Sequence, residues 1–388
     1  MMPAARYAAA IAVLDAIVAG EPAERALTNW GRSNRFAGSG DRAAVRDHVY
    51  DVLRARRTLA ALGGGETGRA LVLGLLRRDG PEPATVFGSG GHAPAALTAE
   101  DATVAVQDLT PAQAANLPDW LWPVWHASLG TDALAVAQVL QRRADVFLRV
   151  NLSRGTVAGA QASLGADGVA TQPVGDVATA LRVTENPRRV AASTAYRDGL
   201  VEVQDTASQR MIAALPVAPG DRVLDYCAGG GGKALALADR LRGPVWAHDI
   251  DPRRMADIVP RSARAGVDVR KLTTAEVARA APFDLVVCDA PCSGSGTWRR
   301  TPDAKLRLTP DDLDRLTITQ AHVIAAGAAC VAPGGALAYA TCSILEAEND
   351  AVVDAFLAGH PGWRRDGGLR LLPTPDHDGF FMALLRAP

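Results

Sequence analysis

The sequence predicts a chain of three parts, of which the last is an α/β fold on a mostly parallel sheet. Residues 1–78 carry apolar side chains at helical spacing, and 131–198 alternates strand, helix and strand. From residue 199 onward, short continuous apolar runs alternate with helical patterns. Such runs are typical of strands in a parallel sheet that is covered on both faces.

The first apolar run is predicted to be a buried amphipathic helix. Ile11, Leu14 and Ile17 recur at helical spacing, and Asp15 breaks the run. This pattern favours a core helix over a signal peptide, and no run in the chain approaches the ~20 apolar residues of a membrane span.

Further helices are predicted over 43–61 and 69–76 from the same periodicity. The Gly/Pro-rich stretch 79–96 predicts a loop or linker, and Pro118 with Asp119 predicts a helix start. We therefore expect a helical domain with its linker over 1–130.

A small α+β segment is expected over 131–198. VFLRVNL (146–152) alternates like a strand, residues 156–168 predict a helix that ends in glycine, and ALRVTE (180–185) predicts another strand.

The remaining domain, 199–388, is predicted to hold the parallel sheet. Four apolar strands are expected, and HDGFF (377–381) is expected to lie in a closing hairpin strand whose phenylalanines pack in the core. The four strands lie in 221–227, 244–250, 283–290 and 335–341. Functional groups are expected at the carboxyl ends of these strands.

Composition excludes several classes of protein. The net charge of −1 argues against a global field that attracts nucleic acid, although local patches are not excluded. Five cysteines, an odd and sparse set, argue against a disulfide framework and fit a reducing cytoplasm. Their spacings match no zinc pattern, so we predict no metal. We predict no membrane partner, because no apolar run is long enough for a span.

A glycine run between a strand and a helix, within 223–238, predicts a ligand loop. A phosphate-binding P-loop needs glycine where Cys227 stands and Ser or Thr where Ala234 stands, and a dinucleotide fingerprint needs glycine at 234. S-adenosylmethionine fits better, because it has no pyrophosphate, and Asp249 lies after the next strand for the ribose hydroxyls. The alternative is a tight turn that binds nothing.

Two cysteines end apolar strands of the predicted sheet, Cys292 in DAPCSGSG and Cys342 in ATCS. A thiolate near a methyl donor indicates covalent activation of a pyrimidine, since addition to carbon 6 makes carbon 5 nucleophilic. Asp289 is a suitable partner for ring nitrogen 3. These residues alone leave open which cysteine attacks.

Free cysteine is also a common buried apolar residue. We give that interpretation to Cys288 and Cys330, which lie within apolar runs. Cys227 is interpreted as a wall of the glycine loop.

These motifs, with several further stretches, resemble those of the RsmB/Nop type of RNA cytosine-5 methyltransferases. The matching stretches are GLVEVQDTASQ (199–209), LDYCAGGGGK (224–233), HDID (248–251), DAPCSGSGTWRRTPDAK (289–305), YATCSILEAEND (339–350) and HDGFFMALL (377–385). The helical region resembles the NusB-like RNA-binding domain of the bacterial 16S rRNA member, and LPDWL (117–121) with FLRVNLSR (147–154) resembles its middle portion.

The resemblance implies a Rossmann-like methyltransferase that uses S-adenosylmethionine. It implies Cys342 as the nucleophile, Cys292 as the residue of product release, and Asp289 as the acid that touches both cofactor and base. The implied cofactor contacts are Cys227, Ala228, Gly229, Gly230, Gly231, Gly232, Lys233, Asp249 and Asp289.

The implied reaction is methyl transfer to carbon 5 of a cytidine in rRNA, with the 16S molecule as the expected substrate and the protein as a monomer. A tRNA methyltransferase and a non-catalytic ribosome-assembly factor remain alternatives. Two departures from the family stand out: Gly230 replaces a proline, and 270–277 holds only Glu276 where the family has an acid on the adenine side.

RNA contacts are predicted for the basic cluster that follows the Cys292 turn, namely Arg299, Arg300 and Lys305, with Trp298 beside it for stacking. The alternative is a solvated loop with a core tryptophan.

Overall fold

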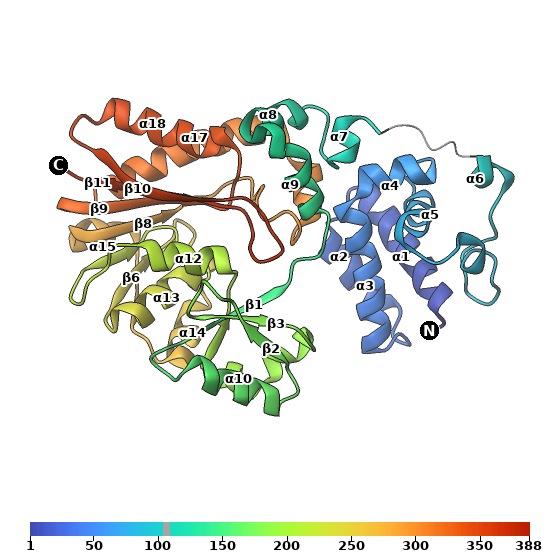
Figure 1. Cartoon of the computed structure of the whole chain (residues 1–388), viewed down its shortest axis with the longest axis horizontal. Helices are drawn as coiled ribbons and strands as arrows, with labels where there is room; N and C mark the ends of the chain where they lie inside the picture. The colour runs from blue at the N-terminus through green and yellow to red at the C-terminus, as the bar shows by residue number, and fades with distance from the viewer. Residues whose placement is uncertain (104–108) are drawn as a thin grey trace. The chain divides into compact units, whose positions relative to one another are not determined.

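The computed structural model describes residues 1–103 and 109–388. These form two compact units, which we describe separately (Figure 1). One unit comprises Met1–Arg143 with Trp298–Pro310, and the other comprises Ala144–Thr297 with Asp311–Pro388. The domain borders expected at residues 130 and 198 stay predictions.

The first unit is helical. Its helices are α1 (Pro3–Val18), α2 (Ala23–Ser33), α3 (Ser39–Arg54), α4 (Arg56–Gly63), α5 (Gly68–Asp79), α6 (Ala99–Thr103), α7 (Pro111–Ala114), α8 (Leu121–Leu129), α9 (Ala133–Leu140) and α16 (Pro302–Arg307), with 3-10 turns η1 (Pro83–Thr85) and η2 (Gly130–Asp132). The helix expected over 43–61 is divided at Ala55, whose φ of −127° and ψ of 25° leave helical geometry. The stretch 79–96 is a loop that contains η1, as predicted.

The core of this unit is formed by α1 to α5. Leu14 and Val13 of α1 are buried against Val49 and Leu53 of α3 and Leu71 of α5. The prediction of a buried amphipathic first helix is confirmed. No single helix in the described ranges is long and apolar enough to cross a membrane; the sharply bent pair α4 and α5 meets that test only when taken together, and both helices contribute to this core.

The segment Trp298–Pro310 packs with the helices of the first unit. The Trp298 ring stacks on Trp125 with centroids 5.8 Å apart and planes 15° apart. Arg54 Nε donates to the Arg299 carbonyl at 2.9 Å, and Lys305 Nζ donates to the Arg54 carbonyl at 3.5 Å. Trp298 is only 1% exposed, so its burial matches the core alternative and not base stacking.

Lys305 is expected to make the stability of the protein depend on pH. Burial lowers the pKa of its ammonium to about 7, so the unfolded chain binds more protons than the folded one between about pH 7 and 10. The contribution of Lys305 to the free energy of unfolding therefore rises with pH across that window, by at most about 1.4 kcal/mol per pH unit. We expect Lys305→Met to flatten the rise of the urea midpoint between pH 7 and 9, whereas Lys271→Met, at an exposed position, leaves it intact. Parallel curves for Lys305→Met and the parent protein would contradict the prediction.

The second unit begins with a four-stranded antiparallel sheet in the order β2-β3-β1-β4. Its elements are β1 (Val146–Val150), α10 (Val157–Ala166), β2 (Thr171–Pro173), β3 (Ala180–Val183), the 3-10 turn η3 (Pro187–Ala192), α11 (Thr194–Arg197) and β4 (Val201–Val203). The two strands and the helix predicted within 146–185 are confirmed. Asp239 anchors the end of β1, because the N–H groups of Leu152 and Ser153 donate to it at 3.0 and 2.9 Å.

A seven-stranded sheet follows, in the order β10-β11-β9-β8-β5-β6-β7. Its elements are α12 (Thr206–Ala214), β5 (Val223–Asp225), α13 (Gly232–Leu241), β6 (Val245–His248), the turn η4 (Pro252–Met255), α14 (Ile258–Ala265), β7 (Val269–Leu272), α15 (Thr274–Ala280), β8 (Phe283–Asp289), α17 (Pro310–Ala328), β9 (Val331–Thr341), the turn η5 (Glu346–Glu348), α18 (Asp350–Gly359), β10 (Arg364–Leu371) and β11 (Phe380–Arg386). Strands β9, β8, β5, β6 and β7 are parallel, while β11 pairs antiparallel with both β9 and β10. The mostly parallel sheet is confirmed. Of the stretch expected in the closing hairpin strand, Phe380 and Phe381 lie in β11, whereas 377–379 precede it.

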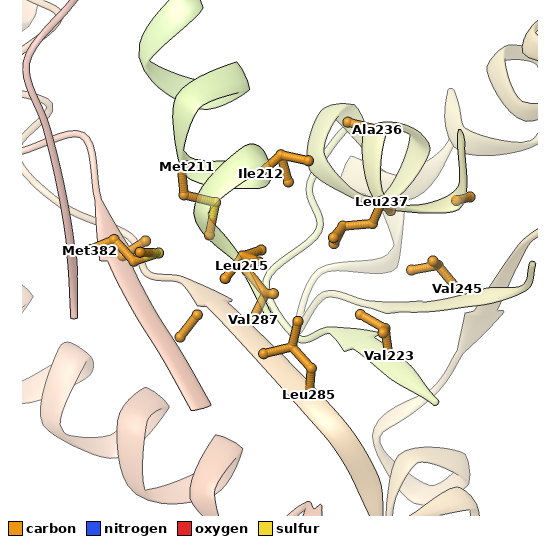
Figure 2. Packing of buried hydrophobic residues seen from close by; sticks show 14 of the residues in the cluster. Met211, Ile212, Leu215, Val223, Ala236, Leu237, Val245, Leu285, Val287 and Met382 are labelled. Atoms are coloured by element: carbon orange, nitrogen blue, oxygen red, sulfur yellow. The ribbon is translucent and has the colours of Figure 1, made fainter. Parts of the chain in front are cut away.

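Alternate residues of each strand point to opposite sides of this sheet, and helices cover both sides, so both faces are buried. Leu285 and Val287 of β8 pack with α12, α13 and α14, whereas Val286 and Cys288 pack with α15, α17 and α18. Figure 2 shows the first of these clusters, and Figure 1 shows α17 and α18 on the other side of the sheet from α12 and α13. This arrangement accounts for the continuous apolar runs in the sequence.

Candidate functional site

A cavity of about 570 Å³ opens where the strand order of the large sheet reverses, at the carboxyl ends of β5 and β8. Reversal points of this kind form crevices between loops that leave in opposite directions. Its lining comprises Gln204, Asp205, Ser208, Asp225, Cys227, Ala228, Gly229, Gly230, Gly232, Lys233, Arg254, Asp289, Ala290, Pro291, Cys292 and Cys342. Most of the residues predicted from the sequence as catalytic or cofactor-binding therefore share one cavity.

The glycine loop joins β5 to α13 in a conformation that requires glycine. Gly229 and Gly231 have φ of 50° and 81°. A Cβ on Gly231 would lie 2.7 Å from Ile258 Cγ1. The loop therefore packs closely and leaves the first N–H groups of α13 available at the cavity.

Asp249 holds this loop in place. The Gly229 N–H donates to its carboxylate at 3.0 Å, the Asp251 N–H donates at 3.0 Å, and Arg254 forms an ion pair at 3.2 Å. Asp249 is buried and is not among the residues that line the cavity. Its expected contact with the ribose stays a prediction.

The lining residues that sequence reasoning missed include Gln204, Ser208, Arg254 and, as the one buried carboxylate among them, Asp225. It is completely buried, and within the described part of the chain neither carboxylate oxygen has a hydrogen-bond partner of good geometry. Burial raises its pKa to about 7, with Asp289 adding to the rise and Lys233 opposing it. Such a carboxylate is matched to a cationic ligand group. Its place at the end of β5, like that of Asp289 at the end of β8, was the signal available in the sequence.

Lys233 of α13 and Asp289 of β8 form an ion pair across the cavity, with Nζ 2.6 Å from Oδ2. Desolvation lowers the pKa of Lys233, but the attraction of Asp289 outweighs it and the pKa is raised overall. Lys233 thus stays cationic beside Asp289. Gln204 Nε2 donates to the Gly232 carbonyl at 3.1 Å and supports the start of α13.

The structure brings Cys292 and Cys342 together, with their sulfur atoms 3.4 Å apart. The hydrogen bond from Cys292 lowers the pKa of Cys342; burial and Asp289 oppose this, and Lys233 and the Thr297 hydroxyl, 4.0 Å away, assist it. The pKa of Cys292 is raised by the same hydrogen bond, by burial and by the charge of Glu348. Within this pair a thiolate is therefore favoured on Cys342 and disfavoured on Cys292.

The remaining cysteines are not arranged as nucleophiles. Cys288 and Cys330 lie in the apolar cluster behind β8, as predicted. Burial raises the pKa of Cys227, which lines the cavity as a wall of the loop.

The predicted basic cluster, Glu276 and the expected absence of a metal site concern parts of the chain outside the cavity. Arg299 and Lys305 are each 2% exposed, whereas Arg300 is exposed, so only Arg300 has the exposure that a phosphate contact requires. RNA binding by these side chains stays a prediction. Glu276 accepts from the Thr273 N–H at 2.8 Å in a capping box at the start of α15. Within the described ranges, no group of three or more His, Cys, Asp or Glu side chains is placed to hold a metal ion.

Family models match two parts of the chain. Residues 212–386 match the model described as 16S rRNA methyltransferase RsmB/F. Residues 117–190 match the ferredoxin-like domain of RsmF/B-like methyltransferases.

Curated relatives extend this likeness over most of the chain. The ribosomal RNA small subunit methyltransferase B of Xanthomonas campestris is 36% identical over 70% of this chain and 66% of its own length. The protein of the same name from Xylella fastidiosa is 35% identical over 71% of this chain and 70% of its length. The probable ribosomal RNA small subunit methyltransferase B of Bacillus subtilis is 30% identical over 69% and 66%.

Solved structures share the fold. The crystal structure of PH0851 superposes over 99% of both chains with a TM-score of 0.76 at 23% identity. A methyltransferase homolog from Pyrococcus horikoshii covers 72% of this chain and 98% of its own, with a TM-score of 0.61 at 23% identity.

Proposed function

Because the chain belongs to the RsmB/F family of 16S rRNA methyltransferases, we propose that it methylates carbon 5 of a cytidine in small-subunit rRNA through a covalent cysteine adduct. The observation that carries this proposal is the pair of sulfur atoms 3.4 Å apart at the edge of a cavity that also holds Asp289 and Lys233. A thiolate so placed is suited to nucleophilic catalysis.

S-adenosylmethionine is the methyl donor we propose, and the residues of the cavity fit it. The Asp225 carboxylate, which has no hydrogen-bond partner of good geometry in the described part of the chain, suits its ammonium group, and the N–H groups at the start of α13 suit its carboxylate. The side-chain-free loop at Gly229 to Gly232 leaves room for close approach. When bound, the cofactor supplies an electrophilic methyl group.

The chain's own residues then divide the work. Cys342 adds through sulfur to carbon 6 of the cytosine, which makes carbon 5 nucleophilic. Ring nitrogen 3 accepts hydrogen bonds, so the proposal places Asp289 there in its protonated form, with a proton supplied by the Lys233 ammonium 2.6 Å away; donation to this nitrogen favours the addition. After methylation the carbon 5 proton passes to a base, for which we propose Cys292 once it has lost its own proton to solvent. The electron pair of the C–H bond forms the double bond between carbons 5 and 6, the carbon–sulfur bond breaks, and Cys342 leaves as a thiolate.

Cofactor binding is expected to weaken as pH falls, because Asp225 has a pKa of about 7 and must lose its proton to pair with a cation. Between pH 7.5 and 6 the affinity should fall about tenfold, since most of the carboxylate becomes protonated. Calorimetric titration with S-adenosylmethionine checks this. Asp225→Asn should bind weakly with a flat profile, while Asp198→Asn, at an exposed position, should behave like the parent protein. A steep profile retained in Asp225→Asn would contradict the assignment.

The proposed substrate is tested by bisulfite sequencing of total rRNA and tRNA from cells with and without the gene. Loss of protection at one small-subunit rRNA cytidine is the expected result. A change at a tRNA cytidine instead would support the proposed reaction but show that tRNA is the substrate. No change at any cytidine, in a protein that still binds S-adenosylmethionine, would favour a non-catalytic assembly factor.

A further inference from the structure

Glu348 is a buried carboxylate at the end of η5, outside the cavity lining, and the mechanism above does not use it. Four donors surround it. The Ser293 N–H donates to Oε1 at 2.7 Å and Gln320 Nε2 donates to the same oxygen at 3.0 Å. The hydroxyl groups of Ser293 and Ser343 both donate to Oε2. A group that receives four donors and supplies none is arranged as a negatively charged acceptor.

Two serines connect this carboxylate to the two cysteines of the site. Ser293 directly follows Cys292, and Ser343 directly follows Cys342. Glu348 therefore binds the residue next to each cysteine and ties together two loops that are 50 positions apart. Ser295 strengthens the tie, because its hydroxyl lies 2.8 Å from that of Ser343 and accepts from the Ile344 N–H at 2.9 Å.

Rigid elements hold the carboxylate itself. Gln320 of α17 donates both to Glu348 and to the Pro291 carbonyl, the latter at 2.9 Å. The Tyr339 hydroxyl of β9 donates to the Glu348 carbonyl at 2.7 Å. Because a helix and a strand hold Glu348 in place, its carboxylate fixes the positions of the two cysteine loops and so the distance between the two sulfur atoms.

Cys292 and Cys342 have different charged neighbours. Glu348 acts on Cys292, where a negative charge disfavours a thiolate. On the Cys342 side, the ammonium of Lys233 favours a thiolate and the carboxylate of Asp289 opposes it, while the Thr297 hydroxyl adds a donor. Lys233 and Asp289 neutralise each other in part, whereas the charge of Glu348 acts on Cys292.

We propose that Glu348 is a positioning residue that holds the two cysteine loops together and keeps Cys292 protonated, so that Cys342 is the nucleophile. The proposal rests on the proposed function for the meaning of nucleophile, and it assigns Glu348 no contact with substrate. It explains why each cysteine is followed by serine: a small hydroxyl reaches the common carboxylate from both loops.

The test is alkylation of the full-length protein by iodoacetamide, followed by mass spectrometry of the Cys292 and Cys342 peptides between pH 6 and 9. In the parent protein Cys342 should react first, about tenfold faster than Cys292 at pH 7, because thiolate and not thiol is alkylated. Glu348→Gln, which keeps the size and removes the charge, should bring the two rates close together and shift the pH profile of Cys292 to lower pH. Glu348→Asp should retain the order.

Gln320→Leu is the matched control, since it loosens the Cys292 loop but leaves the carboxylate. It should change rates without moving either pH profile. An unchanged preference for Cys342 in Glu348→Gln overturns the proposal, and so does an equal loss of preference in Gln320→Leu. If Glu348→Gln does not fold, the order of alkylation in the parent and Glu348→Asp proteins decides, because faster reaction of Cys292 in either one overturns the proposal.

The readout needs neither RNA nor cofactor. If methylation of RNA is absent while the alkylation order holds, the proposed function fails and the role of Glu348 in arranging the pair stands. If methylation occurs while Cys292 is the more reactive thiol, the role of Glu348 fails alone.

Discussion

Replacing Cys342 by alanine should abolish methylation, with a loss on the order of 10⁴-fold, because it removes the sulfur proposed to bond to carbon 6, and the pKa of the neighbouring Cys292 thiol is raised. The hydrogen bond with Cys292 lowers the pKa of Cys342, and Lys233 assists, which favours the thiolate that the proposal requires. Transfer of labelled methyl groups from S-adenosylmethionine to rRNA measures the loss.

Two controls separate this effect from damage to the fold. Cofactor binding by Cys342→Ala should be close to that of the parent protein, because Asp225 and the start of α13 are unchanged. Cys330→Ala, at a buried cysteine in the apolar cluster behind β8, should keep its activity apart from a small loss of stability. A Cys342→Ala protein that still methylates RNA would sink the covalent mechanism.

Replacing Cys292 by alanine should have the opposite consequence and trap the enzyme on its RNA. Cys342 can still add to the base, but the group 3.4 Å from its sulfur atom that is proposed to take the carbon 5 proton is gone. The carbon–sulfur bond then persists after methylation. We expect a protein–RNA band that survives denaturing electrophoresis and turnover reduced on the order of 10³-fold.

The double variant Cys292→Ala with Cys342→Ala is the matched control for the adduct. It should give no band, because the attacking sulfur is absent. Normal turnover without an adduct in Cys292→Ala would show that this cysteine has no part in product release. An adduct formed by the double variant would place the covalent bond on some other residue.

The architecture was largely predictable, because it depends on local periodicity. Helical spacing in the first 78 residues and continuous apolar runs after residue 199 correspond to α1–α5 and to β5, β6, β8 and β9. The division at Ala55 was missed, since the apolar pattern runs through it while the backbone turns. The strand assignments succeeded because side chains of a strand buried on both faces leave an uninterrupted apolar record.

The basic cluster after Cys292 shows where local reasoning ends. A run such as Trp298, Arg299 and Arg300 reads as surface in a sequence, because charge alone does not report what packs on it. In the structure, Trp298 stacks on Trp125, and Lys305 is buried beside the Arg54 carbonyl. Partners from more than 170 positions away supplied that burial.

The sequence by itself determined the strand–glycine–helix unit, the two cysteines at strand ends and their likeness to one enzyme family, because these features are local in the chain. Only the tertiary structure decided that Cys292 and Cys342 lie 3.4 Å apart, that Asp225 is a buried carboxylate without a partner of good geometry in the described part of the chain, and that Glu348 binds both cysteine loops. The physical reason is that separations, desolvation and the choice of hydrogen-bond partners depend on how distant segments pack. Those three quantities set which sulfur carries the charge, and spacing along the chain does not contain them.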